Sequence, residues 1–154
     1  MSDKFKALHV LDTISFATLA TANTKGEPWN TPVFCAHDGF TIYWCSHEES
    51  VHSQNIAANG RVFITIYNSK AGPGEGLGVY LQAHARVLKD ESEIRQALEL
   101  LGQRRGRPFQ FIEKFMGDSP RHVYTAEPVA VWTNDANIDT DGDFIRDFRV
   151  EVEE

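Results

Sequence analysis

The sequence contains little cysteine, no long apolar run and fewer basic than acidic residues. Its two cysteines, Cys35 and Cys45, are too few for a disulfide framework, and free thiols suit a reducing compartment. No apolar run approaches the roughly 20 residues that a membrane-spanning helix needs. The N-terminus, MSDKFKALHV, lacks the apolar core and cleavage site of a signal peptide. We therefore expect a cytoplasmic protein with no membrane partner.

The charge balance argues against a nucleic-acid partner. The chain has 15 Lys and Arg against 22 Asp and Glu, a net charge of -7, whereas phosphate backbones are bound by clustered basic residues. The one basic cluster, Arg104, Arg105 and Arg107, lies where a helix is expected to end, a position that favours cations anyway. With 154 residues and 11% aromatics, the chain is expected to form a single domain over residues 1–154.

Hydrophobic periodicity and turn residues predict a mainly β protein with α additions. The expected elements are a helix over residues 2–11, strands over 16–22, 29–36 and 41–45, a helix over 50–58, strands over 61–67 and 79–88, helices over 90–102 and 108–117, a strand over 122–133 broken at Pro128, and a last strand or arm over 144–152. Most neighbouring strands are joined as hairpins, which is typical of an antiparallel barrel or sandwich. A small barrel fills its own interior, so a sizeable ligand is expected outside it, in a groove or between subunits.

Three connections carry specific predictions. The segment from His37 to Phe40 predicts a two-residue hairpin turn at Asp38-Gly39. The stretch over 68–78 is rich in Gly and Pro and is expected to be irregular, as lids and partner contacts often are. Pro28 and Pro32 cannot donate to a β-ladder, so the first half of the 29–36 strand is expected at an edge, at a bulge or against something other than a strand.

The stretch from Thr41 to Tyr67 predicts a strand, a tight turn, a short helix and a strand. Ser50 is a suitable N-cap, and the free N–H groups of the following turn favour an anion such as phosphate. Hydroxyls from Ser46 and Ser50 and the imidazole of His52 are expected to converge on that point. A capped linker helix without a ligand is the alternative, and these residues alone leave both open.

Two other patterns resemble metal sites without the geometry for one. Cys35 and Cys45 are each followed by a nearby His, but the expected hairpin places the two cysteines on opposite faces of the sheet. The acidic run over 135–143 resembles the start of a calcium loop, but Phe148 stands where a bidentate Glu is needed. We expect an acidic hairpin turn there, and no metal site.

Neither the aromatics nor the nucleophiles identify a site. The three tryptophans, Trp29, Trp44 and Trp132, are expected in the core or at an interface, with stacking on a flat ligand as the alternative. No G-x-S-x-G elbow or other local signature indicates a catalytic triad.

Three segments together resemble a known family. They are FATLATANTKGEPWNTPVF, TIYWCSHEESVHSQNIAANGRVFITIY and VYLQAHARVL. Their order of strand, G-x-P turn, strand, hairpin and S-x-x-x-S helix resembles the FMN-binding split-barrel family typified by pyridoxamine 5'-phosphate oxidase, over about residues 16–88. The resemblance implies an antiparallel split β-barrel that forms a homodimer and binds FMN at the subunit interface.

The resemblance also implies which residues bind the cofactor. In the family, one strand runs along the isoalloxazine ring and supplies backbone hydrogen bonds, and a phosphate pocket combines two hydroxyls with two basic residues. The matching strand residues are Asn30, Thr31, Pro32, Val33 and Phe34. The matching hydroxyls are those of Ser46 and Ser50, and the two basic positions are occupied by Val51 and His52.

Because Val51 and His52 replace the two basic residues of the family, two permanent positive charges are missing. This replacement predicts either weak FMN binding or an additional arginine from the partner subunit. Arg61, Arg86 and Arg146 are the candidates. Thr31 and Ala36 stand where the oxidase has basic contacts to its cofactor, so we do not expect oxidation of vitamin B6 itself.

We expect a small FMN-dependent oxidoreductase acting on a small-molecule substrate that the sequence does not identify. His37, His47 and Tyr43 lie near the expected cofactor region, but nothing selects a catalytic residue among them. The alternatives are a non-enzymatic binder or sensor of flavin, haem or deazaflavin, and an interaction domain that has lost its cofactor.

Overall fold

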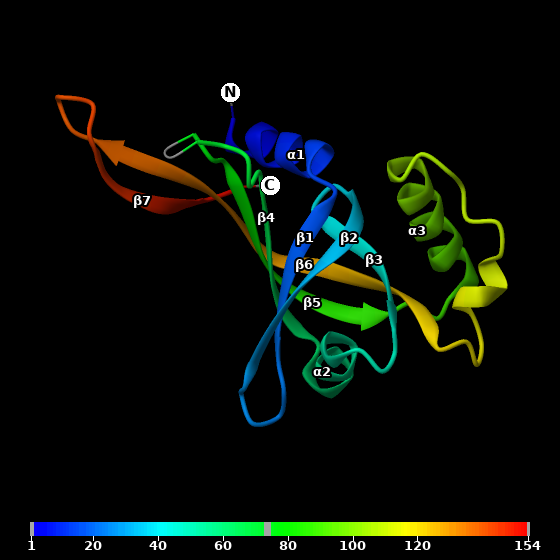
Figure 1. Ribbon diagram of the computed structural model, residues 1–154. Helices are drawn as coiled ribbons and strands as arrows, with labels where there is room; N and C mark the ends of the chain where they lie inside the picture. Colours follow the sequence, from blue (N-terminus) through cyan, green and yellow to red (C-terminus); the bar gives the residue numbers. More distant parts are fainter. Residues whose placement is uncertain (1, 73–74, 154) are drawn as a thin grey trace.

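The computed structural model describes residues 2–72 and 75–153, which form a sheet of seven strands with helices packed around it (Figure 1). The elements are α1 (Asp3–Thr13), β1 (Phe16–Ala22), β2 (Pro28–Asp38), β3 (Thr41–His47), α2 (Val51–Asn59), β4 (Arg61–Tyr67), β5 (Gly78–Val87), α3 (Glu91–Arg104), a 3-10 turn η1 (Ile112–Phe115), β6 (Arg121–Ile138) and β7 (Phe144–Glu151). None of the helices described is long and apolar enough to cross a membrane.

The sheet is antiparallel and closes on itself. Its strand order is β3-β2-β1-β4-β5-β6-β7, and β3 also pairs with β6, which closes β1 to β6 into a barrel. β7 pairs with β6 beyond the barrel, so the end of β6 and β7 form a projecting arm (Figure 1). The predicted mainly β antiparallel split barrel is confirmed.

Alternate residues of the strands fill the barrel. Leu19, Ile64 and Leu81 are among the side chains buried there, as the period of two in a half-buried strand requires. α1 covers this core with Ala7, Val10 and Leu11, whereas Phe5 in its first turn is exposed. A second apolar cluster joins α3 to the outside of β3 and β6.

The hairpin between β2 and β3 turns one residue later than expected. Asp38 pairs with Thr41, so the turn residues are Gly39 and Phe40 rather than Asp38 and Gly39. Gly39 has φ +56°, and glycine at the first central position suits a type II′ turn, which matches the twist of the strands. The predicted turn was therefore wrong by one position, because the Asp-Gly pair also suited a type I′ turn.

The two cysteines lie on opposite faces of the sheet, as the sequence predicted. Cys35 belongs to the barrel core, and Cys45 packs against the α3 cluster. Burial raises the pKa of the Cys35 thiol to about 11 and that of the Cys45 thiol to about 12. Both are therefore neutral and unreactive at neutral pH.

Two expected elements differ in the structure. β6 runs unbroken through Pro128, because Val129 bulges outward where Gln82 pairs with Ala130 and Ala83 with Pro128. The helix expected over 108–117 is only the short η1, because the preceding segment is held in an irregular conformation. There the Arg105 guanidinium donates to the carbonyl oxygens of Arg107 and Pro108.

The remaining expectations have mixed outcomes. Asp90 caps α3 by accepting from the N–H groups of Ser92 and Glu93, and the Glu93 carboxylate binds Arg86. Asp139 accepts two backbone N–H groups in the turn between β6 and β7, so the acidic run is the expected hairpin turn. In the 68–78 connection, residues 73 and 74 lie outside the described part of the chain, and the described residues up to β5 are irregular.

Candidate functional site

A cluster of hydroxyl groups and one imidazole lies where β3 leads into α2. β3 ends at His47, a three-residue turn follows, and α2 begins at Val51. Asn55 fixes the helix against the barrel, because its Nδ2 donates to Thr21 Oγ1 of β1 at 2.9 Å, with both side chains buried. α2 thus packs against β1 and β2, and its last residue, Asn59, donates to the Ala22 carbonyl oxygen near the tip of the β1–β2 hairpin, whereas its N-terminus directly follows β3 (Figure 1).

The structure brings Ser46, Ser50 and His52 together. The Oγ of Ser46 lies 2.7 Å from His52 Nε2, and the Oγ of Ser50 lies 3.3 Å from the same nitrogen. Ser50 Oγ donates to His47 O at 2.7 Å and is 2.8 Å from Ser53 Oγ. Because one hydroxyl has one proton, Ser53 is the donor in the last pair. Ser53, which the sequence analysis did not identify, completes the cluster.

Ser50 occupies the N-cap position of α2, but its hydroxyl makes no capping bond to the helix. The predicted N-cap position is therefore right, but the predicted capping hydrogen bond is wrong, because the Ser50 hydroxyl bonds the His47 carbonyl oxygen instead. The N–H groups of the first turn keep their capacity to bind an acceptor, and the dipole of a nine-residue helix favours a negative one.

His52 is the titratable member of this cluster and is buried, at 8% exposure. Burial lowers its pKa, because the protonated imidazole loses hydration that the cluster does not replace. The imidazole is therefore neutral at neutral pH. The other groups around the cluster are Tyr124, whose pKa burial raises and whose side chain bonds Ser53, and the pair of His122 Nε2 with the Glu48 carboxylate at 3.0 Å.

The strand segment from Asn30 to Phe34 is an open edge. Among the described residues, this segment pairs only with β1, and pairing with β3 begins at Cys35. Pro32, opposite Thr18, thus lies on an edge strand, which confirms one of the expected explanations for the two prolines. Asn30 and Pro32 are exposed, Thr31 and Phe34 are half-buried, and Val33 is buried.

The outer face of the barrel over β4, β5 and β6, on the far side of β1 from this edge, carries aromatic side chains. Phe63 stacks on Trp132 with ring centroids 6.3 Å apart, and the Arg149 guanidinium lies 4.3 Å from the ring centre of Tyr80 and 5.3 Å from that of Phe63. Trp44 is buried in the core and Trp29 is 48% exposed on β2, so the three tryptophans have three different environments.

Several candidates lie outside the cluster. His37 binds Asp12 and the Gly39 carbonyl at the opposite end of β2, and Tyr43 packs against α3. Among the possible arginines, Arg86 is already paired with Glu93 and Glu127, whereas Arg61 begins β4 and Arg146 lies on the arm. The sequence-predicted residues Val51 and His52 differ in exposure: Val51 points to solvent and His52 is buried.

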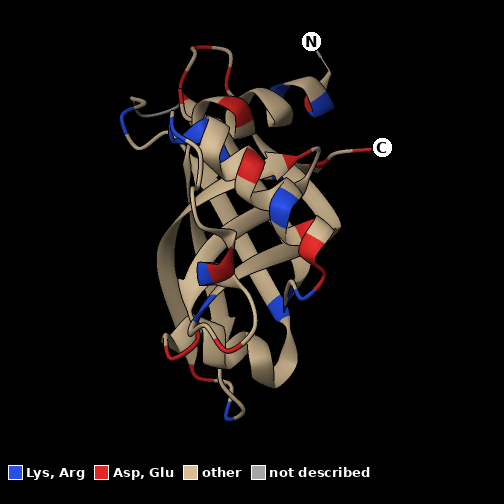
Figure 2. Ribbon diagram, turned by 90° about the vertical axis from the view of Figure 1, so that its right-hand side faces the viewer, with Lys and Arg blue, Asp and Glu red and all other residues tan. Residues whose placement is uncertain are grey.

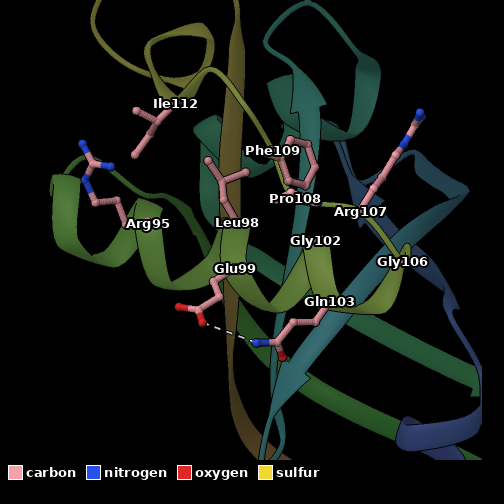
Figure 3. Close-up of a pocket in the computed structure, with 10 residues that line it drawn as sticks. All are labelled: Arg95, Leu98, Glu99, Gly102, Gln103, Gly106, Arg107, Pro108, Phe109 and Ile112. Atoms are coloured by element: carbon pink, nitrogen blue, oxygen red, sulfur yellow. Dashed lines mark hydrogen bonds between the residues drawn. The ribbon is translucent and has the colours of Figure 1, made fainter.

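A separate hollow of about 480 Å³ lies between α3 and the segment after it (Figure 3). Leu98, Phe109 and Ile112 form its apolar part, and Glu99 and Gln103 are hydrogen-bonded to each other along the helix. It shares no residue with the Ser46 cluster. Acidic and basic residues are interspersed around this helix rather than segregated (Figure 2).

Comparisons with known proteins agree with the architecture. The family model described as pyridoxamine 5'-phosphate oxidase matches residues 1–135. Among solved structures, a haem-binding protein from Mycobacterium smegmatis superposes with a TM-score of 0.73 at 20% identity, covering 98% of this chain and 58% of that one. The chain therefore spans little more than half of that protein. A search of curated proteins gave no match.

Two further structures match over most of their length. The haem storage protein HutZ from Vibrio cholerae has a TM-score of 0.67 at 16% identity, with coverage of 83% of this chain and 91% of that one. The general stress protein 26 from Bacillus anthracis has a TM-score of 0.64 at 15% identity, with coverage of 93% and 97%. At these identities the similarity establishes the shared fold.

Proposed function

The chain belongs to the pyridoxamine 5'-phosphate oxidase family, and we propose that it binds FMN and acts as a small flavin-dependent oxidoreductase. The observation that carries this proposal is the convergence of Ser46, Ser50 and His52 at the N-terminus of α2. Hydroxyl donors beside free helix N–H groups suit the phosphate of a flavin nucleotide.

The open edge of β2 supports the other half of the site. Backbone groups from Asn30 to Phe34 that face away from β1 are available to a ligand, and Pro32 loses nothing by lying there. We assign the polar edge of the isoalloxazine ring to this segment and the phosphate to Ser46, Ser50 and the first turn of α2, with Val51 and His52 at the two positions that are basic in the family.

Bound FMN would supply the hydride or electron transfer. The chain's own residues bind and orient it: hydroxyls hold the phosphate, the β2 edge aligns the ring, and His52 contributes a neutral donor or acceptor rather than a fixed charge. The aromatic outer face around Phe63, Tyr80 and Trp132 supports a homodimer that covers the ring, since large aromatics are enriched at interfaces.

Paired titrations with FMN and riboflavin test the phosphate assignment. Ser46→Ala and Ser50→Ala each remove a hydrogen bond to a charged group, worth about 1.5–3 kcal/mol. We expect FMN to bind roughly 10- to 100-fold more weakly while riboflavin binding changes little. Ser92→Ala, at the exposed start of α3, is the control and should leave both affinities unchanged. Equal losses for the two flavins would contradict the assignment.

A non-enzymatic haem binder is the second candidate, because two of the similar structures are named for haem. His52 is buried and its Nε2 faces the Ser46 and Ser50 hydroxyls, so His47, exposed beside the cluster, is the accessible candidate for an iron ligand. Its Nδ1 faces the Glu49 N–H at 3.2 Å and accepts from it, so the neutral ring carries its proton on Nε2 and has no free lone pair there. This arrangement favours flavin over haem. Turnover of NAD(P)H with a dye acceptor by the flavin-loaded protein separates an oxidoreductase from a binder.

A further inference from the structure

β7 forms one edge of the sheet. It is the last strand of the sheet and pairs only with β6 among the described residues. The arm that it forms extends away from the barrel (Figure 1). An exposed edge presents unpaired N–H and C=O groups, and natural proteins usually block such edges with charged residues, above all lysine, with proline, or with a covering segment. Phe144–Glu151 contains neither proline nor lysine, and its charged residues are of both signs: Arg146, Asp147, Arg149 and Glu151. These charges oppose pairing with most strands, but not with a strand that sets opposite charges against them.

The arm also exposes large apolar side chains. Phe144 is 58%, Ile145 60% and Phe148 39% exposed, and Ile138 across the hairpin is 66% exposed. A two-stranded ribbon is marginally stable alone. An arm of this composition therefore gains stability from a covering strand.

We propose that β7 pairs antiparallel with β7 of a second copy of this chain, with Phe148 opposite Phe148 at the two-fold axis. In an antiparallel pair, two residues opposite each other either both point their N–H and C=O groups at the other strand or both point them away. These orientations alternate along a strand, so two-fold symmetry requires one residue to lie opposite its own copy on the axis. The possible registers therefore differ in which residue lies on the axis.

Charge and overlap select among these registers. Centring the pair on Arg146, Asp147, Arg149 or Glu151 would place like charges opposite each other at the axis, which is destabilising. Phe144, Ile145 and Val150 lie near the ends of β7, so a pair centred on any of them joins at most three residues of each strand. Centring it on Phe148 joins residues 145–151 of each strand.

The Phe148 register also creates two reciprocal ion pairs. It places Asp147 opposite Arg149 of the second copy, on the same face of the ribbon, and the symmetry repeats the contact. Neither residue has an ion-pair partner among the described residues, and the guanidinium of the exposed Arg149 lies over the rings of Tyr80 and Phe63. An aromatic pair flanked by two opposite-charge pairs is a favourable cross-strand arrangement.

Disulfide cross-linking tests the register without any flavin. In Phe148→Cys the two new thiols would face each other with Cβ atoms about 4.5–5.5 Å apart, and mild oxidation should give mostly covalent dimer. In Ile145→Cys, also exposed, the copies of the thiol would lie six residues apart along the pair, about 20 Å at about 3.4 Å per residue. That variant should remain uncross-linked. The native thiols do not affect the comparison, because both variants contain them; Cys35 is buried and Cys45 is half-buried.

Two outcomes would overturn the proposal. One is cross-linking of Phe148→Cys no faster than that of Ile145→Cys. The other is an unchanged rate when Asp147→Arg, which sets arginine against Arg149, is added to Phe148→Cys; we expect a several-fold slower rate, restored by adding Arg149→Asp. Unchanged melting temperatures of the reduced variants would show that the fold is intact.

Discussion

At the scale of single residues, His52 links stability to pH. In the unfolded chain an imidazole takes up a proton near its ordinary pKa of 6.5, whereas burial lowers the pKa of His52 in the folded protein. Below about pH 6.5 the unfolded state therefore binds the proton first, and folding loses stability as the pH falls toward the folded pKa.

We expect His52→Gln to remove this part of the pH dependence. The measurement is urea unfolding of both proteins at about pH 7.5 and about pH 5.5, conditions on either side of an ordinary histidine pKa. On going from the higher to the lower pH, the wild type should lose more unfolding free energy than the variant does. The ion pairs of His37 with Asp12 and His122 with Glu48 are present in both proteins and cancel in the comparison. If the wild type and the variant differ in unfolding free energy by the same amount at both pH values, His52 is not a buried neutral imidazole.

At the scale of elements, Gly60 fixes how α2 turns into β4. It ends the helix with φ +69°, and a Cβ there would lie 3.1 Å from the Ala85 carbonyl oxygen, which belongs to the neighbouring strand. Gly60→Ala should therefore cost about 1–2 kcal/mol for the left-handed conformation, and more for the close approach.

Gly106→Ala is the matched control for this effect. Gly106 follows α3 with φ +76° and has no atom within 4 Å of the position of a Cβ. In a denaturant titration, the Gly106→Ala variant should lose only the unfolding free energy that the left-handed conformation costs, without the cost of a close approach. If Gly106→Ala proves as costly as Gly60→Ala, the close packing between α2 and β5 plays no part in stability.

The elements also show where local sequence information ends. Strands with a clear alternation, such as Phe16–Ala22 and Arg61–Tyr67, were predicted to the residue, because their buried faces fix the pattern. The turn after β2 was displaced by one position, since two turn types suit Asp38-Gly39-Phe40. The passage of β6 through Pro128 depends on a bulge opposite β5, a long-range pairing that no local pattern reveals.

At the scale of the whole molecule, the sequence predicted the split barrel through a family resemblance and the hairpin order. It also predicted that Ser46, Ser50 and His52 would converge, because all three lie in one short strand–turn–helix segment. Ser53 was missed because a serine inside a helix gives no signal of its own, and its position depends on Ser50 and Tyr124. The closure of β3 on β6 and the projection of β7 come from pairings between distant segments.

The absorbance spectrum of the protein, purified without added cofactor and then incubated with equal amounts of FMN and haem, tests the central claim most directly. The cluster at Ser46 and the open edge of β2 predict that the flavin bands shift on binding and that the shift saturates as FMN is added, also in the presence of haem. A shifted Soret band with no change in the flavin bands, or no change in either spectrum, would contradict the assignment of this site to FMN.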